Sequence, residues 1–353
     1  MKKSIQIAGT FVSLVVGAGF ASGQEIMQYF TSFGLVSVFG CIVAAAIFAF
    51  LGMTLAQIGS ELQTTSHKEG IHYIGGRAFG PVLDVLISIV LFGIAIVMFA
   101  GAGATFNQMY NMEPSFGSML MTLAVVFTLL LNANSIINMI AALMPYLLGI
   151  IFILLIYSLF TVDYSISELN IIAKKQPSAS SHWLTSAVLY VSYNIAAGAA
   201  MLILMGGTTK DRKAARMGGA LGGGVLGLLI LLINLALFAK MDIVAGVDMP
   251  TLELAKQIHP TVGNIMSIVL LAMIYSTAVG TLYILAVRIV KKENLMMKII
   301  VILLSLVGFA ASLIGFTTLV GKLYTIMGYL GMVLIVAIVL AQIRILRTNK
   351  RKI

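Results

Sequence analysis

Charged residues are scarce in this chain. Only 10% of its 353 residues are Asp, Glu, Lys or Arg, against about 25% in soluble domains, while 60% are apolar and the mean hydropathy is +1.06. This balance excludes an ordinary soluble domain and indicates an integral membrane protein. The apolar runs last about 20 residues without alternating polar and apolar positions, which excludes an outer-membrane barrel and predicts membrane-spanning helices.

The residues that build metal, redox and nucleotide sites are equally scarce. The single cysteine, Cys41, lies in an apolar run and has no partner for a disulfide. The four histidines lie in or beside loops without the spacing of metal ligands, and no Gly-rich phosphate loop of the Walker type is present. We therefore expect neither an enzyme nor an ATP-driven pump, and no cofactor apart from a coupling ion.

Apolar runs separated by polar breaks predict ten membrane-spanning helices. Their expected ranges are 5–32, 35–59, 81–107, 117–131, 138–161, 183–206, 217–239, 262–288, 297–314 and 319–345. A polar exterior linker at 164–182 contains the sequence KKQPS, which ends any helix there and separates two halves of five spans, 1–163 and 183–345. Because five is an odd number, the second half must cross the membrane with inverted topology.

The distribution of basic residues predicts the orientation. With the N-terminus in the cytoplasm, 17 of the 22 Lys and Arg residues fall on the cytoplasmic side. This bias follows the positive-inside rule and places both termini in the cytoplasm, with a basic tail at 346–353. The net charge of +10 is then a topology signal. The expected partners are the lipid bilayer and a small solute, not nucleic acid.

Glycines interrupt the first span. Residues Gly17 to Glu25 read GAGFASGQE, which puts three glycines and a polar cluster in the middle of a membrane helix. Each glycine costs about 1 kcal/mol relative to alanine in a helix interior, so three together weaken the helix. Unwound backbone at this depth is tolerated only where it lines a cavity or a ligand. The amides around Phe20, Ala21 and Ser22 are then expected to face a carboxylate, and the carbonyls before the break a cation.

The sixth span carries a similar cluster, YNIAAGAA from Tyr193 to Ala200, in which Ala-Ala-Gly at 196–198 corresponds to Gly-Ala-Gly at 17–19. Glycine-interrupted spans at corresponding positions of two inverted halves point to the substrate site of a transporter. The alternative is that both clusters are small-residue faces, which let membrane helices approach closely without any break. The coincidence of the two clusters favours the binding site.

Glu25 is the one acidic residue clearly inside the first span, where a charged group costs roughly 2.5–3.5 kcal/mol. Its candidate partner is Lys322, near the outer end of the tenth span. We hypothesise that the pair forms an outer gate, or that Glu25 accepts a proton instead. The alternative is that Glu25 only reaches exterior water.

The eighth span contains the hydroxyl-rich sequence YSTAVGT from Tyr275 to Thr281. Ser276 and Thr277, together with backbone carbonyls, suit a hard cation such as Na⁺, because such cations take oxygen ligands. These hydroxyls have an alternative role, which is to bond back to the preceding turn of their own helix.

Together these features resemble the amino acid, polyamine and organocation (APC) transporter superfamily, whose leucine-transporter fold has five plus five inverted helices with breaks in helices 1 and 6. The GAGFASGQE motif also resembles the YkvI-type membrane protein family, and the likeness covers nearly the whole chain. The resemblance implies a substrate carboxylate near Gly19 to Ser22 and a substrate amino group near Asn194 to Ala197. It also implies a Na⁺ site at the carbonyls near Ser13 and Val16 and the hydroxyls of Ser276 and Thr277. The implied substrate site comprises Gly17, Ala18, Gly19, Phe20, Ala21, Ser22, Asn194, Ala197 and Gly198.

The sequence thus predicts a secondary active transporter in a bacterial cell membrane, working by alternating access. We expect an amino acid or a related amine as the solute and Na⁺ or H⁺ as the coupling ion. The alternative is a receptor subunit on the same fold, similar to the permease-like components of spore germination complexes, which binds a solute without transporting it. Both would keep the broken helices, and the sequence leaves the solute, the direction of transport and the oligomeric state open.

Overall fold

The computed structural model describes residues 2–64, 67–131, 137–290 and 295–350, and within these ranges the regular elements are all helices. The first half contains α1 (Lys2–Val15), α2 (Ala18–Ser22), α3 (Gln24–Tyr29), the 3₁₀ helix η1 (Thr31–Val36), α4 (Ser37–Leu62), α5 (His67–Tyr110), α6 (Pro114–Leu131) and α7 (Ile137–Phe160). The rest contains α8 (Ile166–Ala173), α9 (Trp183–Gly207), α10 (Arg212–Ala239), α11 (Met241–Val244), α12 (Pro250–Ile258), α13 (Pro260–Ile289), α14 (Leu295–Ser312) and α15 (Phe316–Lys350).

Eight stretches of the described chain are long and apolar enough to cross a membrane. They are Thr31–Leu62, Phe79–Tyr110, Pro114–Leu131, Trp183–Gly207, Arg212–Ala239, Pro260–Ile289, Leu295–Ser312 and Phe316–Ile345. The expected first span, 5–32, is divided among short helices, and the expected fifth span corresponds to α7, which holds a shorter apolar stretch at Gly149–Phe160. The all-helical membrane architecture is therefore confirmed, and the count of ten stays a prediction. In the expected tail, residues 351–353 lie outside the described chain.

The linker between the halves contains a helix that the sequence analysis missed. α8 begins after Ser165, whose hydroxyl accepts the Glu168 amide while the Glu168 carboxylate accepts the Ser165 amide. This reciprocal pair is a capping box, which satisfies two amides that an N-terminus otherwise leaves free. The helix ends at Ala173, directly before the KKQPS sequence, so the predicted break lies where it was expected.

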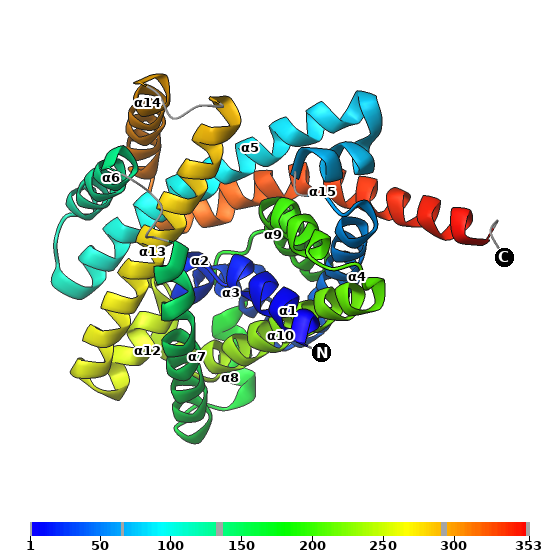
Figure 1. Ribbon diagram of the computed structural model, residues 1–353. Helices are drawn as coiled ribbons and strands as arrows, with labels where there is room; N and C mark the ends of the chain where they lie inside the picture. Colours follow the sequence, from blue (N-terminus) through cyan, green and yellow to red (C-terminus); the bar gives the residue numbers. More distant parts are fainter. Residues whose placement is uncertain (1, 65–66, 132–136, 291–294, 351–353) are drawn as a thin grey trace.

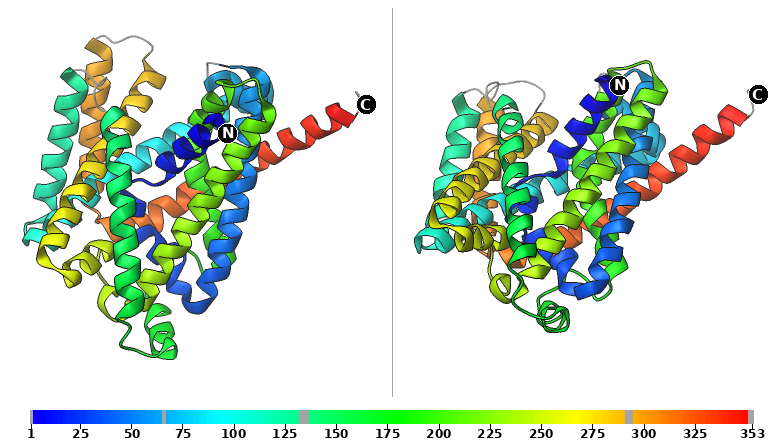
Figure 2. Two further views of the ribbon diagram at one scale, coloured as in Figure 1. Left: turned by 60° about the horizontal axis from the view of Figure 1, so that its bottom comes forward. Right: turned by 90° about the horizontal axis from the view of Figure 1, so that it is seen from below.

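The segmented first span runs through the middle of the helical bundle (Figure 1). α1, α2 and α3 have α4, α9 and α10 on one side and α5 and α13 on the other. In two further views α15 crosses the bundle and its C-terminal part projects beyond it (Figure 2). The interrupted segment is therefore enclosed by helices from both halves of the chain.

Glycines bring α4 into close contact with α9 and α10. A Cβ atom on Gly219 of α10 would lie 2.2 Å from the carbonyl oxygen of Gly52 on α4, and one on Gly206 of α9 would lie 2.1 Å from that of Ala56. Both distances are too short for any side chain unless the backbones separate. Small residues allow this approach between membrane helices, where dispersion contacts replace the hydrophobic driving force. Close packing through glycines therefore holds α4 against α9 and α10.

This packing predicts opposite results for two glycines on one helix. Gly219→Ala should lower the unfolding free energy by about 1–3 kcal/mol, because the added methyl group pushes α10 away from α4. Gly224→Ala meets no atom within 4 Å and should be neutral or gain about 0.5–1 kcal/mol of helix propensity. The measurement is thermal or denaturant unfolding of the purified protein in detergent. Equal losses in the two variants would show that close contact with α4 is not what constrains Gly219.

Candidate functional site

The first span is broken at two glycines, as the sequence predicted. α1 ends at Val15, and Gly17 has an extended backbone (φ −97°, ψ −168°) before α2 begins. A second interruption lies at Gly23, whose φ of +78° falls in the left-handed region that favours glycine. A Cβ atom on Gly23 would also lie 2.8 Å from the Thr251 side chain, so both conformation and space require glycine there.

The first break frees a carbonyl but not every amide that was expected to be free. The Gly17 amide donates to Val15 O at 2.8 Å instead of the carbonyl one helical turn back, so Ser13 O loses its helical partner. The Ala21 amide donates to Gly17 O at 2.9 Å, and Ala21 O accepts the Thr251 hydroxyl. The expectation that the Ala21 amide faces a substrate carboxylate is therefore wrong in this conformation.

The predicted break in the sixth span is also wrong, because α9 runs without interruption from Trp183 to Gly207. Gly198 is surrounded by alanines, which are the best helix formers, and one glycine costs too little to end such a helix. The Asn194 side chain donates back to Tyr190 O on the preceding turn of α9 at 2.9 Å. Gly198 instead faces α1, since a Cβ atom there would lie 4.0 Å from Leu14, while Ala197 is half-buried on the same helix.

One side chain that was expected at a cation site lies beside the first break. Gly17 lies against α13, where a Cβ atom on it would be 3.6 Å from Thr277 Oγ1, so the break next to Val16 faces a hydroxyl of the eighth span. The other expected hydroxyl is turned to its own helix, since Ser276 Oγ donates to Met273 O at 3.0 Å. The Ser276 hydroxyl therefore follows the back-bonding alternative, while the Thr277 hydroxyl faces the break.

Glu25 turns inward from α3 and is only 4% exposed. Its Oε2 accepts the Tyr193 hydroxyl of α9 at 2.7 Å, and its Oε1 packs against Gly19, where a Cβ atom would be 1.8 Å away. Lys322 is exposed on α15, and in the described chain no ion pair joins it to Glu25. The proposed outer gate between Glu25 and Lys322 is therefore not formed, because the carboxylate is directed into the bundle, where it accepts the Tyr193 hydroxyl.

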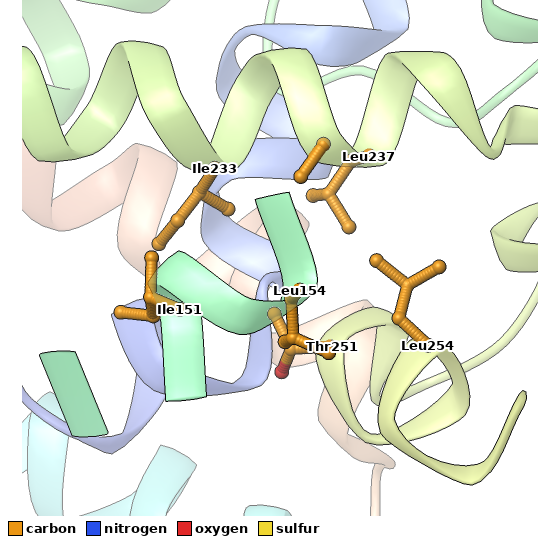
Figure 3. Close-up of a pocket in the computed structure, with 7 residues that line it drawn as sticks. Ile151, Leu154, Ile233, Leu237, Thr251 and Leu254 are labelled. Atoms are coloured by element: carbon orange, nitrogen blue, oxygen red, sulfur yellow. The ribbon is translucent and has the colours of Figure 1, made fainter. Parts of the chain in front are cut away.

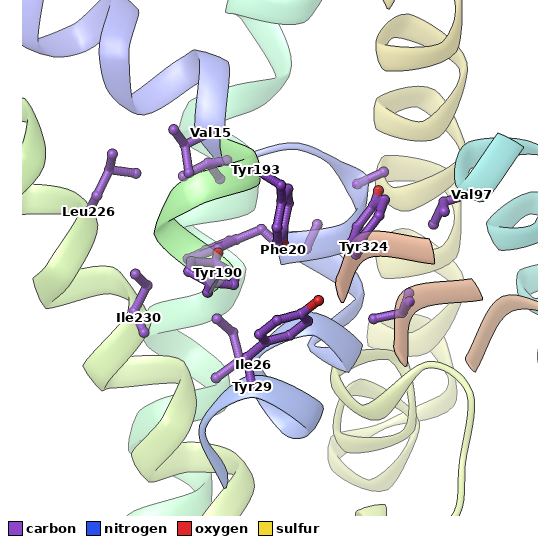
Figure 4. Close-up of a cluster of buried hydrophobic side chains, with 14 of the residues drawn as sticks. Val15, Phe20, Ile26, Tyr29, Val97, Tyr190, Tyr193, Leu226, Ile230 and Tyr324 are labelled. Carbon is purple, nitrogen blue, oxygen red and sulfur yellow. The ribbon is translucent and has the colours of Figure 1, made fainter. Parts of the chain in front are cut away.

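Four buried tyrosines, Tyr29 of α3 with Tyr190, Tyr193 and Tyr324, lie together in the core (Figure 4). The ring centroids of Tyr193 and Tyr324 are 4.7 Å apart, those of Tyr190 and Tyr193 5.5 Å, and those of Tyr29 and Tyr190 5.6 Å. The ring centroids of Tyr29 and Tyr193 are 5.9 Å apart. We call these four residues the tyrosine cluster. It joins the first span to α9 and α15.

Polar side chains close the α12 side of the first span. Gln24 donates to the Thr317 hydroxyl at 3.2 Å, and that hydroxyl donates to Asp248 in the loop before α12. Gln28 donates to Thr317 O at 2.9 Å. With the Thr251 bond to Ala21 O, these contacts fasten α2 and α3 to α15 and to the α12 segment. The first span is therefore enclosed on the side where α8 and α11 lie.

A small pocket beyond Thr251 is apolar. It lies between α7, α10 and α12 and is lined by Ile151, Leu154, Ile233, Ala236, Leu237, Thr251 and Leu254 (Figure 3). The one hydroxyl among these residues is already bonded to Ala21 O. This pocket has no polar group left to orient a solute, so the candidate site is the break in the first span and not this pocket.

The sequence analysis missed the tyrosine cluster, although Tyr190 and Tyr193 are three residues apart and so share a helix face. That spacing was a signal that both rings point at one neighbour. The sequence does not reveal which residues these rings contact, because Tyr29 and Tyr324 lie more than 130 residues away, one on each side.

Comparison with known proteins finds relatives that match nearly the whole length of the chain. No family model matches the chain. It is 26% identical over 336 residues to the uncharacterized membrane protein YkvI of Bacillus subtilis (strain 168), covering 94% of each chain. The chain is therefore similar along nearly its whole length to a membrane protein, and this likeness names no substrate.

Solved structures show the fold. The structure of MhsT in complex with L-phenylalanine matches with a TM-score of 0.61 at 17% identity, covering 87% of this chain and 78% of that one. The inward-facing conformation of Mhp1 matches with a TM-score of 0.65 at 15% identity, covering 93% and 73%. Mhp1 is described as a nucleobase-cation-symport-1 family transporter. The chain has the leucine-transporter fold of these proteins, as the resemblance implied.

The contact of Gly19 with Glu25 predicts non-additive stability effects. Gly19→Ala alone should cost about 1–3 kcal/mol of unfolding free energy, because the new methyl group displaces the Glu25 side chain from Tyr193. In a Glu25→Ala background the same change should cost much less, since the clashing group is gone. The four proteins are compared by thermal unfolding in detergent.

Gly17→Ala is the matched control for this cycle. Its Cβ atom would meet only Thr277, at the ordinary contact distance of 3.6 Å, and its φ of −97° is open to alanine. We expect Gly17→Ala to leave the unfolding midpoint within the range of neutral variants. Additive costs for Gly19→Ala and Glu25→Ala would mean that the two residues do not touch in the folded protein.

Proposed function

We propose that the chain is a secondary active transporter that carries an amino acid or a related amine across a bacterial cell membrane by alternating access. The proposal includes coupling to Na⁺ or H⁺, cytoplasmic termini and distant membership of the YkvI-type family in the APC superfamily. The shared fold supports a transporter, because Mhp1 is described as a nucleobase-cation-symport-1 family transporter and MhsT was solved in complex with L-phenylalanine.

The observation that carries the proposal is the broken first span at the centre of the bundle. A membrane helix whose backbone bonds are interrupted at Gly17 and Gly23 must satisfy the freed groups from inside the protein. Here Thr251 of α12 donates to the backbone carbonyl of Ala21, and Thr277 of α13 lies beside Gly17. Side chains of α9 and α15, which also belong to the second half of the chain, bond to Glu25 and Gln24. An interrupted segment held between two groups of helices is the arrangement in which rocking motions alternately expose a site.

The oxygens near the break fit a monovalent hard cation. Ser13 O lacks its helical donor, and Thr277 Oγ1 faces the break beside Gly17. Oxygen atoms from α1 and α13 therefore converge on one region from the two halves of the chain. This convergence supports Na⁺ as the coupling ion. Among the side chains, Thr277 is the proposed ligand of this ion.

The test is uptake of radiolabelled amino acids and amines into proteoliposomes, with an inward Na⁺ gradient and with an inward proton gradient. Thr277→Val keeps the shape of the side chain and removes its oxygen, so we expect Na⁺-driven uptake to fall by at least tenfold, about 1.4 kcal/mol. Thr281→Val is the matched control. The Thr281 hydroxyl lies one turn away and donates to Thr277 O, so its loss should leave the dependence on Na⁺ unchanged.

The outcomes separate the candidate functions. Accumulation of a solute against its gradient supports the transporter. Specific binding of a solute by the purified protein, without uptake under either gradient, would instead support a receptor subunit on the same fold. Na⁺-driven uptake that Thr277→Val leaves intact would remove the proposed cation site.

A further inference from the structure

The Glu25 carboxylate has no cation beside it. In the part of the chain that the structure describes, no Lys, Arg or His nitrogen lies within 4.0 Å of this group, although it is only 4% exposed. An ionisable side chain inside a membrane span normally faces a partner or a functional path. The structure supplies one hydroxyl, from Tyr193, and no positive charge.

The Glu25 carboxylate and a neighbouring tyrosine hydroxyl can each form further hydrogen bonds. A carboxylate offers about four acceptor positions on its two oxygens. Among the described residues, the Tyr193 hydroxyl occupies one of these positions, on Oε2 of Glu25. The fully buried Tyr190 hydroxyl lies close enough to this carboxylate to interact with it, but within the described residues it makes no hydrogen bond of normal geometry. A buried hydroxyl without a partner is costly, so its persistence points to a group that satisfies it in another state of the protein.

The tyrosine cluster fits the chemistry of an organic cation. The rings of Tyr29, Tyr190, Tyr193 and Tyr324 are at most 2% exposed and lie together (Figure 4), and the Tyr193 hydroxyl bonds to Glu25. Cations are attracted to aromatic faces, and aromatic rings with a carboxylate are a recurring way to hold an ammonium group. An anion at the same place would be repelled by Glu25, and little solvent is present to screen the repulsion.

The position of Glu25 reverses an expectation drawn from the family resemblance. That resemblance puts a substrate carboxylate near Gly19, but the Glu25 carboxylate itself packs against Gly19. Two carboxylates at one dehydrated position would destabilise each other. The protein's own acid therefore occupies the place where a carboxylate of the solute was expected.

We propose that Glu25 and the tyrosine cluster bind the ammonium group of a small organic amine that lacks a free carboxylate. Glu25 accepts hydrogen bonds from the ammonium group, Tyr190 and Tyr193 contribute their hydroxyls, and the rings of Tyr29 and Tyr324 enclose it. This inference rests on the proposed transport function and specifies its substrate class.

The experiment compares matched solutes by thermal-shift binding to the purified full-length protein. One series is n-pentylamine, L-norleucine and hexanoate, and the other is phenethylamine, L-phenylalanine and 3-phenylpropanoate. Within each series the apolar part is kept while the charged groups change. We expect both amines to stabilise the wild-type protein and both carboxylates without an amine to leave it unaffected.

Variants identify the residues responsible. Glu25→Gln keeps the side-chain size and should weaken amine binding about ten- to a hundredfold, since a charge-assisted bond is lost. Tyr193→Phe removes one hydroxyl and should weaken binding by a smaller factor. Glu168→Gln makes the same carboxylate-to-amide change on the exposed helix α8 and should bind amines as the wild type does. If Glu25→Gln fails to fold, Tyr193→Phe provides the comparison.

Several results would overturn the inference. It fails if no amine stabilises the wild-type protein, or if amines bind Glu25→Gln as tightly as the wild type. Stabilisation by the amino acids alone also overturns it, while leaving the proposed transporter intact. If Glu25→Gln binds amines as tightly as the wild type but loses proton-driven uptake, Glu25 would be a proton site instead. Absence of both binding and uptake for every solute tested would overturn the proposed function as well.

Discussion

The structure depends on the accommodation of a carboxylate, Glu25, inside a helical bundle where no cation from the described residues lies beside it. Glu25 is accommodated because Gly19 has no side chain, because Gly23 turns α3 back with a left-handed φ, and because Tyr193 donates to its Oε2. Each of these features would be unnecessary in an uninterrupted apolar helix. A charged group at this depth costs roughly 2.5–3.5 kcal/mol, so its retention is best explained by a ligand or proton that it receives.

The surrounding helices divide into two groups, and the first span lies between them. On one side, glycines of α9 and α10 pack so closely against α4 that no methyl group fits between the helices. On the other, α5 and α13 are joined by the ion pair of Asp84 and Arg288 at 2.7 Å. Hydrogen bonds that involve Thr251, Gln24, Gln28 and Tyr29 join α2 and α3 to α12 and α15. Two groups of helices joined by such polar bonds suit a rocking motion, in which the bonds break and the site opens.

The parts of this architecture that depend on local sequence were predictable. Apolar runs gave the helices, and three glycines within seven residues gave the break in the first span. The same reasoning was wrong for the sixth span, where one glycine among alanines leaves α9 continuous. It also missed the capping box at Ser165, and it paired Glu25 with Lys322 because both are charged residues expected near the outer side. The tyrosine cluster depends on contacts between Tyr29, Tyr193 and Tyr324, and residues so distant in sequence carry no periodic signal.

The central claim is that the break in the first span becomes accessible from each side of the membrane in turn. Ser22 tests it directly, because it is fully buried in this conformation and its hydroxyl is bonded to Gly19 O. In a chain with Cys41 replaced by Ser, a Ser22→Cys variant would be exposed to a membrane-impermeant thiol reagent in intact cells and in inverted vesicles. Alternating access predicts modification from both sides, slowed on each side by a bound solute. Modification from neither side, or from one side under every condition, would contradict the account.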